Sequence, residues 1–430
     1  MNVLVKAAGG LLVVLVSGSA IAAYRSTLSF QTGAPGVGME VINTTEEVQQ
    51  RLEANGVPKP LPPASQEGQL AVDAYANVRV LGSVSSGEFT RLMTAMTLWV
   101  APDNGCGYCH APERDAKGAI VKDEDGHPVA DAKNMPSDEL YTKRVARRML
   151  QMTMRINGEW KQHVKATGVT CYTCHRGNPV PTGIWFDEPD TATRYQGIPG
   201  PGQDRPSSIA GLAALPRGAL RPYLVGDENV RVQSTEAMGS ENRASIKQTE
   251  WTYGLMIHMS NSLGVNCTYC HNSRSLGEWS VSPPTRNAAW FGIRMVRELN
   301  NEYLGPLARE LPATRLGALG DGPKVGCATC HQGAYKPLLG VSMVGDYPEL
   351  AEARPQPEKT PPPAPAAGTA DGGAESLAGT PDGGMATSGG DGGVDGGRLP
   401  RRSETLKDGG VAPAAPGLAG DAGKGTGDGR

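Results

Sequence analysis

The chain has 430 residues, enough for two or three domains of ordinary size, and its formal net charge is −3. Apolar residues make up 39% of it and aromatic residues only 5%, so side chains alone supply little material for a core of this length. The small net charge and the lack of a long Lys/Arg run exclude nucleic acid as an expected partner.

The first segment in chain order, residues 1–25, is nearly all apolar or small, with Lys6 the only charge between residues 3 and 23. A membrane helix needs about 20 apolar residues, which this run just reaches. A cleaved signal peptide would have a similar length, and the small residues at 19–23 offer a cleavage site. We favour an uncleaved membrane anchor, because the charged start is short and the apolar run is long for a signal peptide. Both interpretations place the rest of the chain outside the cytoplasm.

The next segment, residues 26–86, holds clusters of Gly and Pro around one helical stretch at 44–55. Thr44 or Thr45 suits the N-cap of this helix, and Gly56 suits its end. We expect an extended arm that lies over other parts of the protein rather than a domain with its own core.

All eight cysteines occur in Cys-x-x-Cys-His motifs. They are Cys106, Cys109, Cys171, Cys174, Cys267, Cys270, Cys327 and Cys330, and the histidines of the motifs are His110, His175, His271 and His331. In c-type haem attachment, the two thiols form thioethers with the haem vinyl groups and the adjacent His binds iron. Zinc sites would not need a His after every second Cys, and a thioredoxin-like motif explains one pair of cysteines, not four. The sequence therefore predicts four covalently bound haem c groups and a protein that moves electrons outside the cytoplasm.

The haem-bearing region is predicted to be an internal duplication, with a first half at 87–182, a connector at 183–235 and a second half at 236–350. The two motifs of a half are separated by similar lengths of chain, from Cys106 to Cys171 and from Cys267 to Cys327. A pair of Met in the same relative spacing precedes the first motif of each half: Met93 and Met96, then Met256 and Met259. We expect a mainly α fold, a multihaem cytochrome c with two pseudo-symmetric dihaem halves and few strands.

The last segment, residues 351–430, has no aromatic residue, Ile, Cys or His and is dominated by Asp-Gly-Gly and Ala-Pro units. Such a composition cannot bury enough apolar surface to offset the entropy lost on ordering. We expect a disordered tail.

Each iron needs a second axial ligand, and the three histidines outside the motifs cannot serve four irons. These histidines are His127, His163 and His258. At least one iron therefore takes Met or stays open, and Met stabilises ferrous iron and raises the potential. The candidates are Met93, Met149 and Met256, which precede the motifs that begin at Cys106, Cys171 and Cys267, respectively. Each candidate lies in a stretch with helical apolar spacing. Met96, Met152 and Met259 are alternatives one helical turn away, and any of these residues could simply fill the core.

Six stretches of the chain resemble the tetrahaem cytochrome c subunit of purple-bacterial photosynthetic reaction centres. They are residues 89–100, 145–150, 163–177, 262–267, 292–297 and 330–333. The resemblance covers about residues 70–350, and the haem motifs and the helices between them match in order. Three features depart from the family pattern: a longer segment at 111–138 that carries His127, the tail after Pro348, and the lack of a Cys near the N-terminus for lipid anchoring.

The resemblance implies how the four irons are ligated. Met93, Met149 and Met256 would be the distal ligands of three haems, and His163 would reach across the two-fold axis to the fourth haem, at His331. The duplication alone would instead assign Met295, because the segments 148–157 and 294–300 look alike and pair Met149 with Met295. The resemblance also implies that Arg286 lies beside a haem, where a cation would raise the potential.

The same resemblance implies an electron-transfer subunit rather than an enzyme. It would sit on the periplasmic side of the inner photosynthetic membrane, anchored by the N-terminal segment, with its haems in a row toward the bacteriochlorophyll special pair. It would accept electrons from a soluble cytochrome c or a high-potential iron–sulfur protein and re-reduce the special pair in the core subunits. The alternatives are a multihaem periplasmic oxidoreductase, which needs an open iron position, and a quinol-oxidising electron conduit, which needs more bis-His haems than the His count allows.

Overall fold

The computed structural model describes residues 27–32, 39–188, 205–207, 213–215, 218–232, 246–355 and 357. All of them belong to one compact unit, which ends at Pro361. The predicted membrane segment at 3–23 and nearly all of the predicted tail lie outside the described residues. Within the described ranges, every helix is too short or too polar to cross a bilayer.

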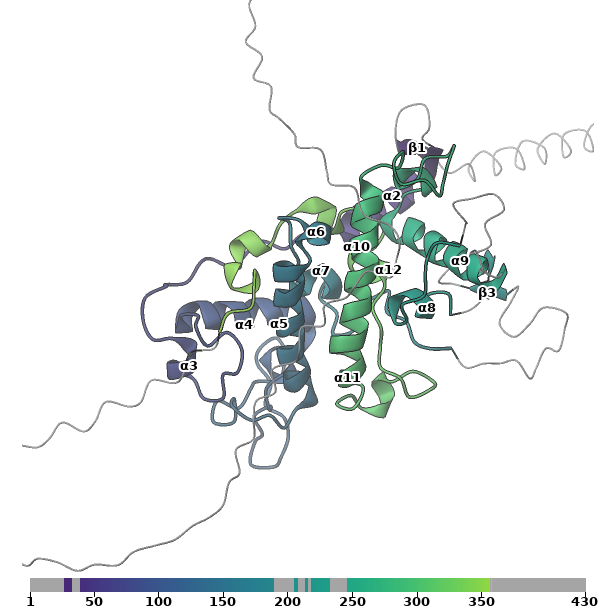
Figure 1. Cartoon of the computed structure of the whole chain (residues 1–430). Coiled ribbons are helices and arrows are strands. Elements are labelled where there is room, and N and C mark those ends of the chain that lie inside the picture. The colour runs from purple at the N-terminus through teal and green to yellow at the C-terminus, as the bar shows by residue number, and fades with distance from the viewer. Residues whose placement is uncertain are drawn as a thin grey trace, which may run out of the picture. The chain divides into compact units, whose positions relative to one another are not determined.

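The described part of the chain is mostly helical (Figure 1), which confirms the prediction of a mainly α fold with few strands. The long helices are α4 Ser86–Val100, α5 Tyr141–Glu159, α9 Ile246–Leu263 and α10 Thr285–Glu298. The shorter helices are α2 Thr45–Ala54, α3 Ala71–Ala74, α6 Lys161–Val164, α7 Cys171–His175, α8 Arg221–Leu224, α11 Gly305–Leu307 and α12 Cys327–His331. Two antiparallel pairs of strands are formed by β1 Thr27–Thr32 with β2 Met39–Thr44 and by β3 Arg205–Ser207 with β4 Ala213–Leu215.

Several tighter or wider turns join these helices. A π-helical segment, η6 Leu299–Leu304, continues α10. The 3₁₀ turns are η1 Pro102–Asn104, η2 Cys106–Tyr108, η5 Cys267–Tyr269, η7 Ala313–Arg315, η8 Pro337–Gly340, η9 Val344–Asp346 and η10 Pro348–Leu350.

Helix α2 begins with a capping box, as its sequence predicts. The Thr44 hydroxyl accepts a hydrogen bond from the Glu47 N–H at 3.1 Å, and the Glu47 carboxylate accepts one from the Thr44 N–H at 2.7 Å. These two bonds satisfy backbone donors that a helix start otherwise leaves unpaired. The expected helix, with Thr44 as its N-cap, is therefore confirmed.

The end of α2 is fastened to segments on both sides of the connector. Asn55 is 1% exposed; its amide donates to the Gln332 carbonyl at 3.3 Å, and its side-chain oxygen accepts from the Leu338 N–H at 3.1 Å. The Tyr172 hydroxyl donates to the Gly56 carbonyl at 3.0 Å. The end of α2 thus contacts residues that are far from it in the sequence.

Two clusters of buried apolar side chains form the core, and each draws on both predicted halves. The first contains Leu92 and Trp99 together with Leu338 and Tyr347 from the C-terminal end of the second half. Its Trp99 and Tyr347 rings meet edge to face, with centroids 4.7 Å apart.

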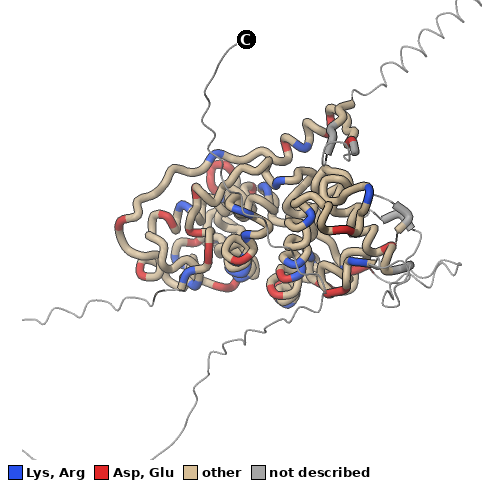
Figure 2. The backbone as a smooth tube through the Cα atoms, turned by 45° about the horizontal axis from the view of Figure 1, so that its top comes forward, with Lys and Arg blue, Asp and Glu red and all other residues tan. Residues whose placement is uncertain are grey.

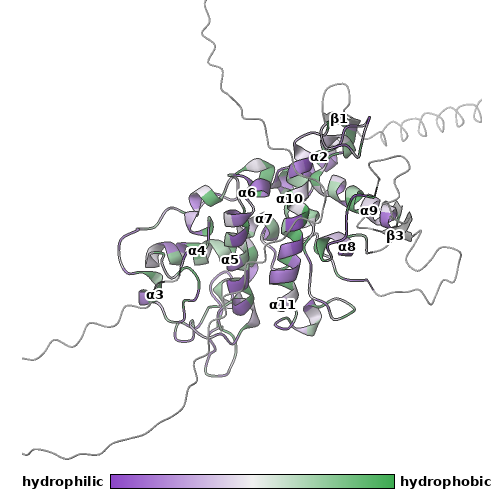
Figure 3. Ribbon diagram, in the orientation of Figure 1, coloured by the Kyte–Doolittle hydropathy of each residue, from purple (hydrophilic) through white to green (hydrophobic). Residues whose placement is uncertain are grey.

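The second cluster contains Leu255 and Ile293 of the second half with Ile156 of the first half and Tyr223 of the predicted connector. Helices α5 and α10 show hydrophilic and hydrophobic residues on different sides (Figure 3), as expected for helices half covered by such a core. Shared burial therefore ties the two predicted halves together.

Charged residues of both signs are interspersed along the described chain (Figure 2). Two ion pairs join α5 to the second half: Arg155 with Glu298 at 2.8 Å and Arg144 with Glu310 at 2.7 Å. Exposed pairs of this kind contribute about 0–1 kcal/mol each, so the apolar clusters provide most of the attraction.

Candidate haem-binding sites

The four Cys-x-x-Cys-His motifs adopt two local conformations that alternate along the chain. The first and third motifs begin in the 3₁₀ turns η2 and η5, whereas the second and fourth form the short helices α7 and α12. Both helices end at a residue with left-handed backbone, Arg176 with φ 48° and Gln332 with φ 44°. The first motif thus resembles the third, and the second resembles the fourth.

Every motif histidine is oriented by a hydrogen bond to a backbone carbonyl. The Nδ1–H of His110 donates to the Met135 carbonyl at 3.0 Å, and that of His175 donates to the Asn178 carbonyl at 2.8 Å. The Nδ1–H of His271 donates to the Leu276 carbonyl at 2.8 Å, and that of His331 donates to the Ala334 carbonyl at 2.9 Å. A carbonyl only accepts hydrogen bonds, so Nδ1 carries the proton and Nε2 keeps the lone pair that binds metal. Burial lowers the pKa of each of these histidines, and that of His331 to about 4, which favours the neutral, metal-binding imidazole.

The cysteines are available for thioether formation, because no disulfide joins any two of the eight, all of which the structure describes. Burial raises the pKa of Cys171 and of Cys327 to about 12. Within the part of the chain that the structure describes, no motif contributes to a cluster of three or more potential metal ligands. The residues present therefore fit four separate haem attachments better than shared zinc sites.

Hydrogen bonds to backbone carbonyls define which motifs are neighbours. The second and fourth motifs meet directly: the Arg176 guanidinium donates to the Cys330 carbonyl at 2.8 Å, and the Gln332 amide donates to the Cys174 carbonyl at 3.4 Å.

The outer motifs join this central pair through equivalent bonds. The Gly177 N–H after the second motif donates to the Trp99 carbonyl in α4, just before the first motif, at 2.8 Å. The Gly333 N–H after the fourth motif donates to the Ser262 carbonyl in α9, just before the third motif, also at 2.8 Å. In space, the motifs are therefore neighbours in the order first, second, fourth, third.

A cation stands beside each outer motif. The Lys143 ammonium donates to the Met135 carbonyl at 2.5 Å, which is the same carbonyl that accepts the His110 Nδ1–H. Arg286, the residue expected beside a haem, donates to the Glu278 carbonyl in the loop after the third motif at 3.0 Å. Lys143 could not be identified from the sequence, because nothing in its local sequence indicates that it reaches the carbonyl that orients His110.

The three proposed distal methionines lie on the helices that precede the motifs, as their spacing predicts. Met93 is on α4, Met149 on α5 and Met256 on α9, and each side chain is partly buried. Met295 differs, because it is only 6% exposed and lies inside the second apolar cluster. The alternatives one turn away are also partly buried, so burial does not separate them from the proposed ligands: Met96, Met152 and Met259.

His163 lies next to His331, although the two are far apart in sequence. It belongs to the short helix α6, and the centroids of the two imidazole rings are 6.1 Å apart, with the ring planes at 67°. Its Nδ1 donates to the Ala288 carbonyl at 2.8 Å, so its Nε2 also keeps the lone pair. Two imidazoles on opposite sides of one metal, with bonds of about 2 Å, have ring centres about 6 Å apart. This pair therefore fits a bis-imidazole iron.

The other two histidines have different surroundings, and His258 Nε2 would lie 3.0 Å from a Cβ added at Gly326, directly before the fourth motif. His127 lies in the 111–138 segment, with its Nδ1 3.7 Å from the Asp123 carboxylate. His258 is 7% exposed on α9. The 111–138 segment itself packs on the first motif: a Cβ added at Gly107 would lie 2.6 Å from the Pro128 Cβ. This close approach accounts for a glycine inside the first motif.

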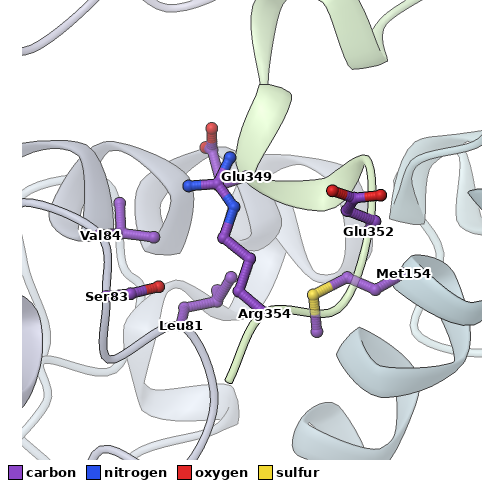
Figure 4. A pocket seen from close by; sticks show the side chains of 7 residues that line it. All are labelled: Leu81, Ser83, Val84, Met154, Glu349, Glu352 and Arg354. Atoms are coloured by element: carbon purple, nitrogen blue, oxygen red, sulfur yellow. The ribbon is translucent and has the colours of Figure 1, made fainter. Parts of the chain in front are cut away.

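One small cavity lies away from the motifs (Figure 4). It has a volume of about 10 Å³, room for about one water molecule. Its lining residues are Leu81, Ser83, Val84, Met154, Glu349, Glu352 and Arg354, none of which belongs to a motif. It is far too small for a macrocycle and is not a haem site.

Comparison with known proteins shows which sequences this chain is similar to. Residues 25–351 match the sequence model of the photosynthetic reaction centre cytochrome c subunit. Photosynthetic reaction center cytochrome c subunits from three bacteria are similar to this chain. The protein of Rubrivivax gelatinosus is 45% identical over 75% of this chain and 83% of its own length, and that of Thermochromatium tepidum is 44% identical over 74% of each. The protein of Roseobacter denitrificans is 42% identical over 76% of this chain and 86% of its own length.

Proposed function

This chain belongs to the family of photosynthetic reaction centre cytochrome c subunits, and on that premise we propose how it transfers electrons. It binds four covalent haem c groups, accepts electrons from a soluble periplasmic cytochrome c or high-potential iron–sulfur protein, and re-reduces the photo-oxidised bacteriochlorophyll special pair. Haem supplies the reversible one-electron couple of iron, whereas the protein supplies ligands, spacing and electrostatics. No side chain of the chain acts as an acid, base or nucleophile in this function.

The observation that carries this proposal is the common orientation of five imidazoles. The four motif histidines and His163 all donate Nδ1–H to a backbone carbonyl, which leaves every Nε2 available to iron. We assign His163 and His331 to the fourth haem, because their ring spacing suits one iron. The full set of axial ligands is then Met93 with His110, Met149 with His175, Met256 with His271, and His163 with His331.

A two-fold arrangement of two dihaem halves is part of the proposal. It is supported by paired bonds: Gly177 to Trp99 matches Gly333 to Ser262. Met93 and Met256 precede these two acceptors by the same interval of sequence, which supports equivalent roles for them. The contacts between the motifs suggest a row of haems in the order first, second, fourth, third.

The position at the membrane also belongs to the proposal. Residues 3–23 lie outside the described residues, and we propose that they remain as a membrane helix with the haem-bearing region on the periplasmic side. N-terminal sequencing of the mature subunit tests this, since a chain that begins near Tyr24 would refute the anchor. Partners within the membrane would be the core subunits that hold bacteriochlorophyll.

A redox titration of the purified complex, with the haems resolved by their absorption bands, tests the function. We expect the chain to copurify with bacteriochlorophyll-containing subunits. At least two of its haems should have reduction potentials well above those of the haems in bis-His multihaem proteins. Four low potentials would refute the proposal in favour of a quinol-oxidising conduit. Ready binding of carbon monoxide to the ferrous protein would instead indicate an open iron position and a multihaem oxidoreductase.

A further inference from the structure

Two sets of equivalent hydrogen bonds fix the register between α5 and α10. The Thr142 hydroxyl donates to the Tyr108 carbonyl inside the first motif, and the Thr285 hydroxyl donates to the Tyr269 carbonyl inside the third motif. The two threonines therefore occupy the same position relative to equivalent motifs, and they align Thr142 of α5 with Thr285 of α10.

The second set of bonds lies farther along α5 and in η6, the π-helical continuation of α10. Asn157 holds both backbone groups of Val169, just before the second motif, with its amide at 2.9 Å and its side-chain oxygen at 2.7 Å. Asn300 holds both backbone groups of Val325, just before the fourth motif, at 3.0 Å and 2.8 Å. The interval from Thr142 to Asn157 equals that from Thr285 to Asn300, so both sets of bonds give the same register.

In this register, the position equivalent to Met149 is Gly292, and Met295 is equivalent to Met152. The sequence comparison paired Met149 with Met295 because both follow an Arg and precede an apolar residue. The hydrogen bonds contradict that pairing, which is shifted by almost one helical turn. The interval from Met149 to Asn157 equals the interval from Gly292 to Asn300, whereas Met295 lies closer to Asn300. The second half therefore has no side chain beyond a hydrogen at the place where the first half carries its proposed distal ligand.

The ring of His163 occupies the space beside Gly292. A Cβ added at Gly292 would lie 2.7 Å from Cε1 of His163, 2.9 Å from Nδ1 and 3.3 Å from Nε2. Real Cβ atoms do not approach other heavy atoms this closely, so the ring would have to move. The carbonyl that fixes Nδ1 belongs to Ala288, one helical turn earlier on the same helix α10. Helix α10 thus both admits and orients the imidazole.

We propose that Gly292 is a positioning residue that determines the distal ligand of the fourth haem. Gly292 occupies the position equivalent to Met149. Because glycine has no side chain, His163 can extend from the first half to the site that faces His331. This inference rests on the proposed ligation by His163. The difference between one bis-His haem and three His/Met haems then follows from a single position in a duplicated helix.

The first test is Gly292→Ala in the full complex, with Gly158→Ala in α5 as the matched control. A Cβ at Gly158 would meet its nearest neighbour, Glu352 Cβ, at 3.6 Å, which is ordinary contact. We expect Gly292→Ala to change the electron paramagnetic resonance g-values and the potential of the fourth haem only, and the control to change neither. An unchanged fourth haem in Gly292→Ala would overturn the inference.

The second test moves the ligand back to the equivalent position. The double variant Gly292→Met/His163→Gly should give the fourth haem the methionine–iron charge-transfer band of an oxidised His/Met haem and a higher potential. His163→Gly alone should lose the bis-His spectrum without gaining that band. A double variant that is indistinguishable from His163→Gly would overturn the inference while leaving the proposed ligation intact. If His163→Gly changes no haem, the proposed ligation itself fails and the inference fails with it.

Discussion

The inner and outer haem motifs differ in how the protein surrounds them. The inner motifs, second and fourth, are helical and bind each other through the Arg176 and Gln332 side chains. The first cysteine of each outer motif, Cys106 or Cys267, is exposed, whereas Cys171 of the second motif is buried. The outer motifs are bordered by loops and each has its own cation, Lys143 or Arg286, whereas the inner motifs share Arg176 between them. Ligand identity and packing should therefore dominate the inner potentials, whereas nearby charge and the loops should matter more at the outer ones.

The largest expected effect tests the hydrogen bonds that hold the backbone just before an inner motif. Asn300→Ala removes three hydrogen bonds, to the Leu224 carbonyl and to both backbone groups of Val325, and leaves buried backbone groups unsatisfied. We expect a loss of about 2–4 kcal/mol in the free energy of unfolding, measured by chemical denaturation together with haem content.

Its neighbour offers the control. Asn301 is exposed and donates one bond to the Val225 carbonyl at 2.9 Å. Asn301→Ala should cost less than about 1 kcal/mol. Equal losses in the two variants would show that Asn300 has no special role in holding the fourth motif.

The next effect tests ligand identity at the inner haems. His163→Met replaces an imidazole by a softer thioether, so one haem potential should rise by an amount on the order of 0.1 V, within the roughly 0.8 V that axial ligands span. The other three potentials should stay nearly unchanged in a spectroelectrochemical titration. Met295→Leu should shift none of them, because that side chain lies within the apolar cluster. A shift in Met295→Leu with none in His163→Met would establish the symmetric ligation instead.

A smaller effect tests charge at the outer haems. The Lys143 nitrogen faces three acceptors, the carbonyls of Met135 and Ser137 and, at 3.9 Å, the Asp138 carboxylate, as suits an ammonium with three donors. A unit charge about 10 Å from an iron, at an effective dielectric constant of about 20, contributes about 1.7 kcal/mol, or about 70 mV. Lys143→Met should therefore lower the first haem potential by up to this amount.

Two further substitutions make that measurement specific. Lys143→Arg keeps the charge and should leave most of the potential in place. Lys133→Met removes an exposed charge from the loop after the first motif, where solvent screens it, and should shift the potential by far less. An equal shift in Lys133→Met and Lys143→Met would mean that the outer haem senses net charge rather than a placed cation.

The smallest expected effect concerns the tail. The compact unit ends at Pro361, and the composition beyond it provides little apolar surface to bury. Removal of residues 362–430 should leave the haem content and all four potentials unchanged. A lost haem in this truncation would show that the contrast between inner and outer motifs depends on residues outside the compact unit.

Features that depend on local chemistry can be predicted from the amino-acid sequence. Two cysteines and a histidine at fixed spacing are enough to predict haem attachment, because the thioethers and the iron bond involve neighbouring residues. The same is true of α2, whose start is set by Thr44 and Glu47 within one helical turn. Helical spacing ahead of the motifs made the methionines candidates for distal ligands, and the resemblance to a known family selected among them and added His163.

Contacts between groups that are distant in sequence depend on how the helices pack. His163 meets the Ala288 carbonyl and the His331 ring, and Lys143 reaches the carbonyl that orients His110. No local pattern encodes such contacts, because they arise when helices from both halves pack into shared apolar clusters. The register that pairs Met149 with Gly292 also depends on such contacts. Local sequence similarity pairs Met149 with Met295, whereas the hydrogen bonds from the two helices to equivalent motifs pair it with Gly292.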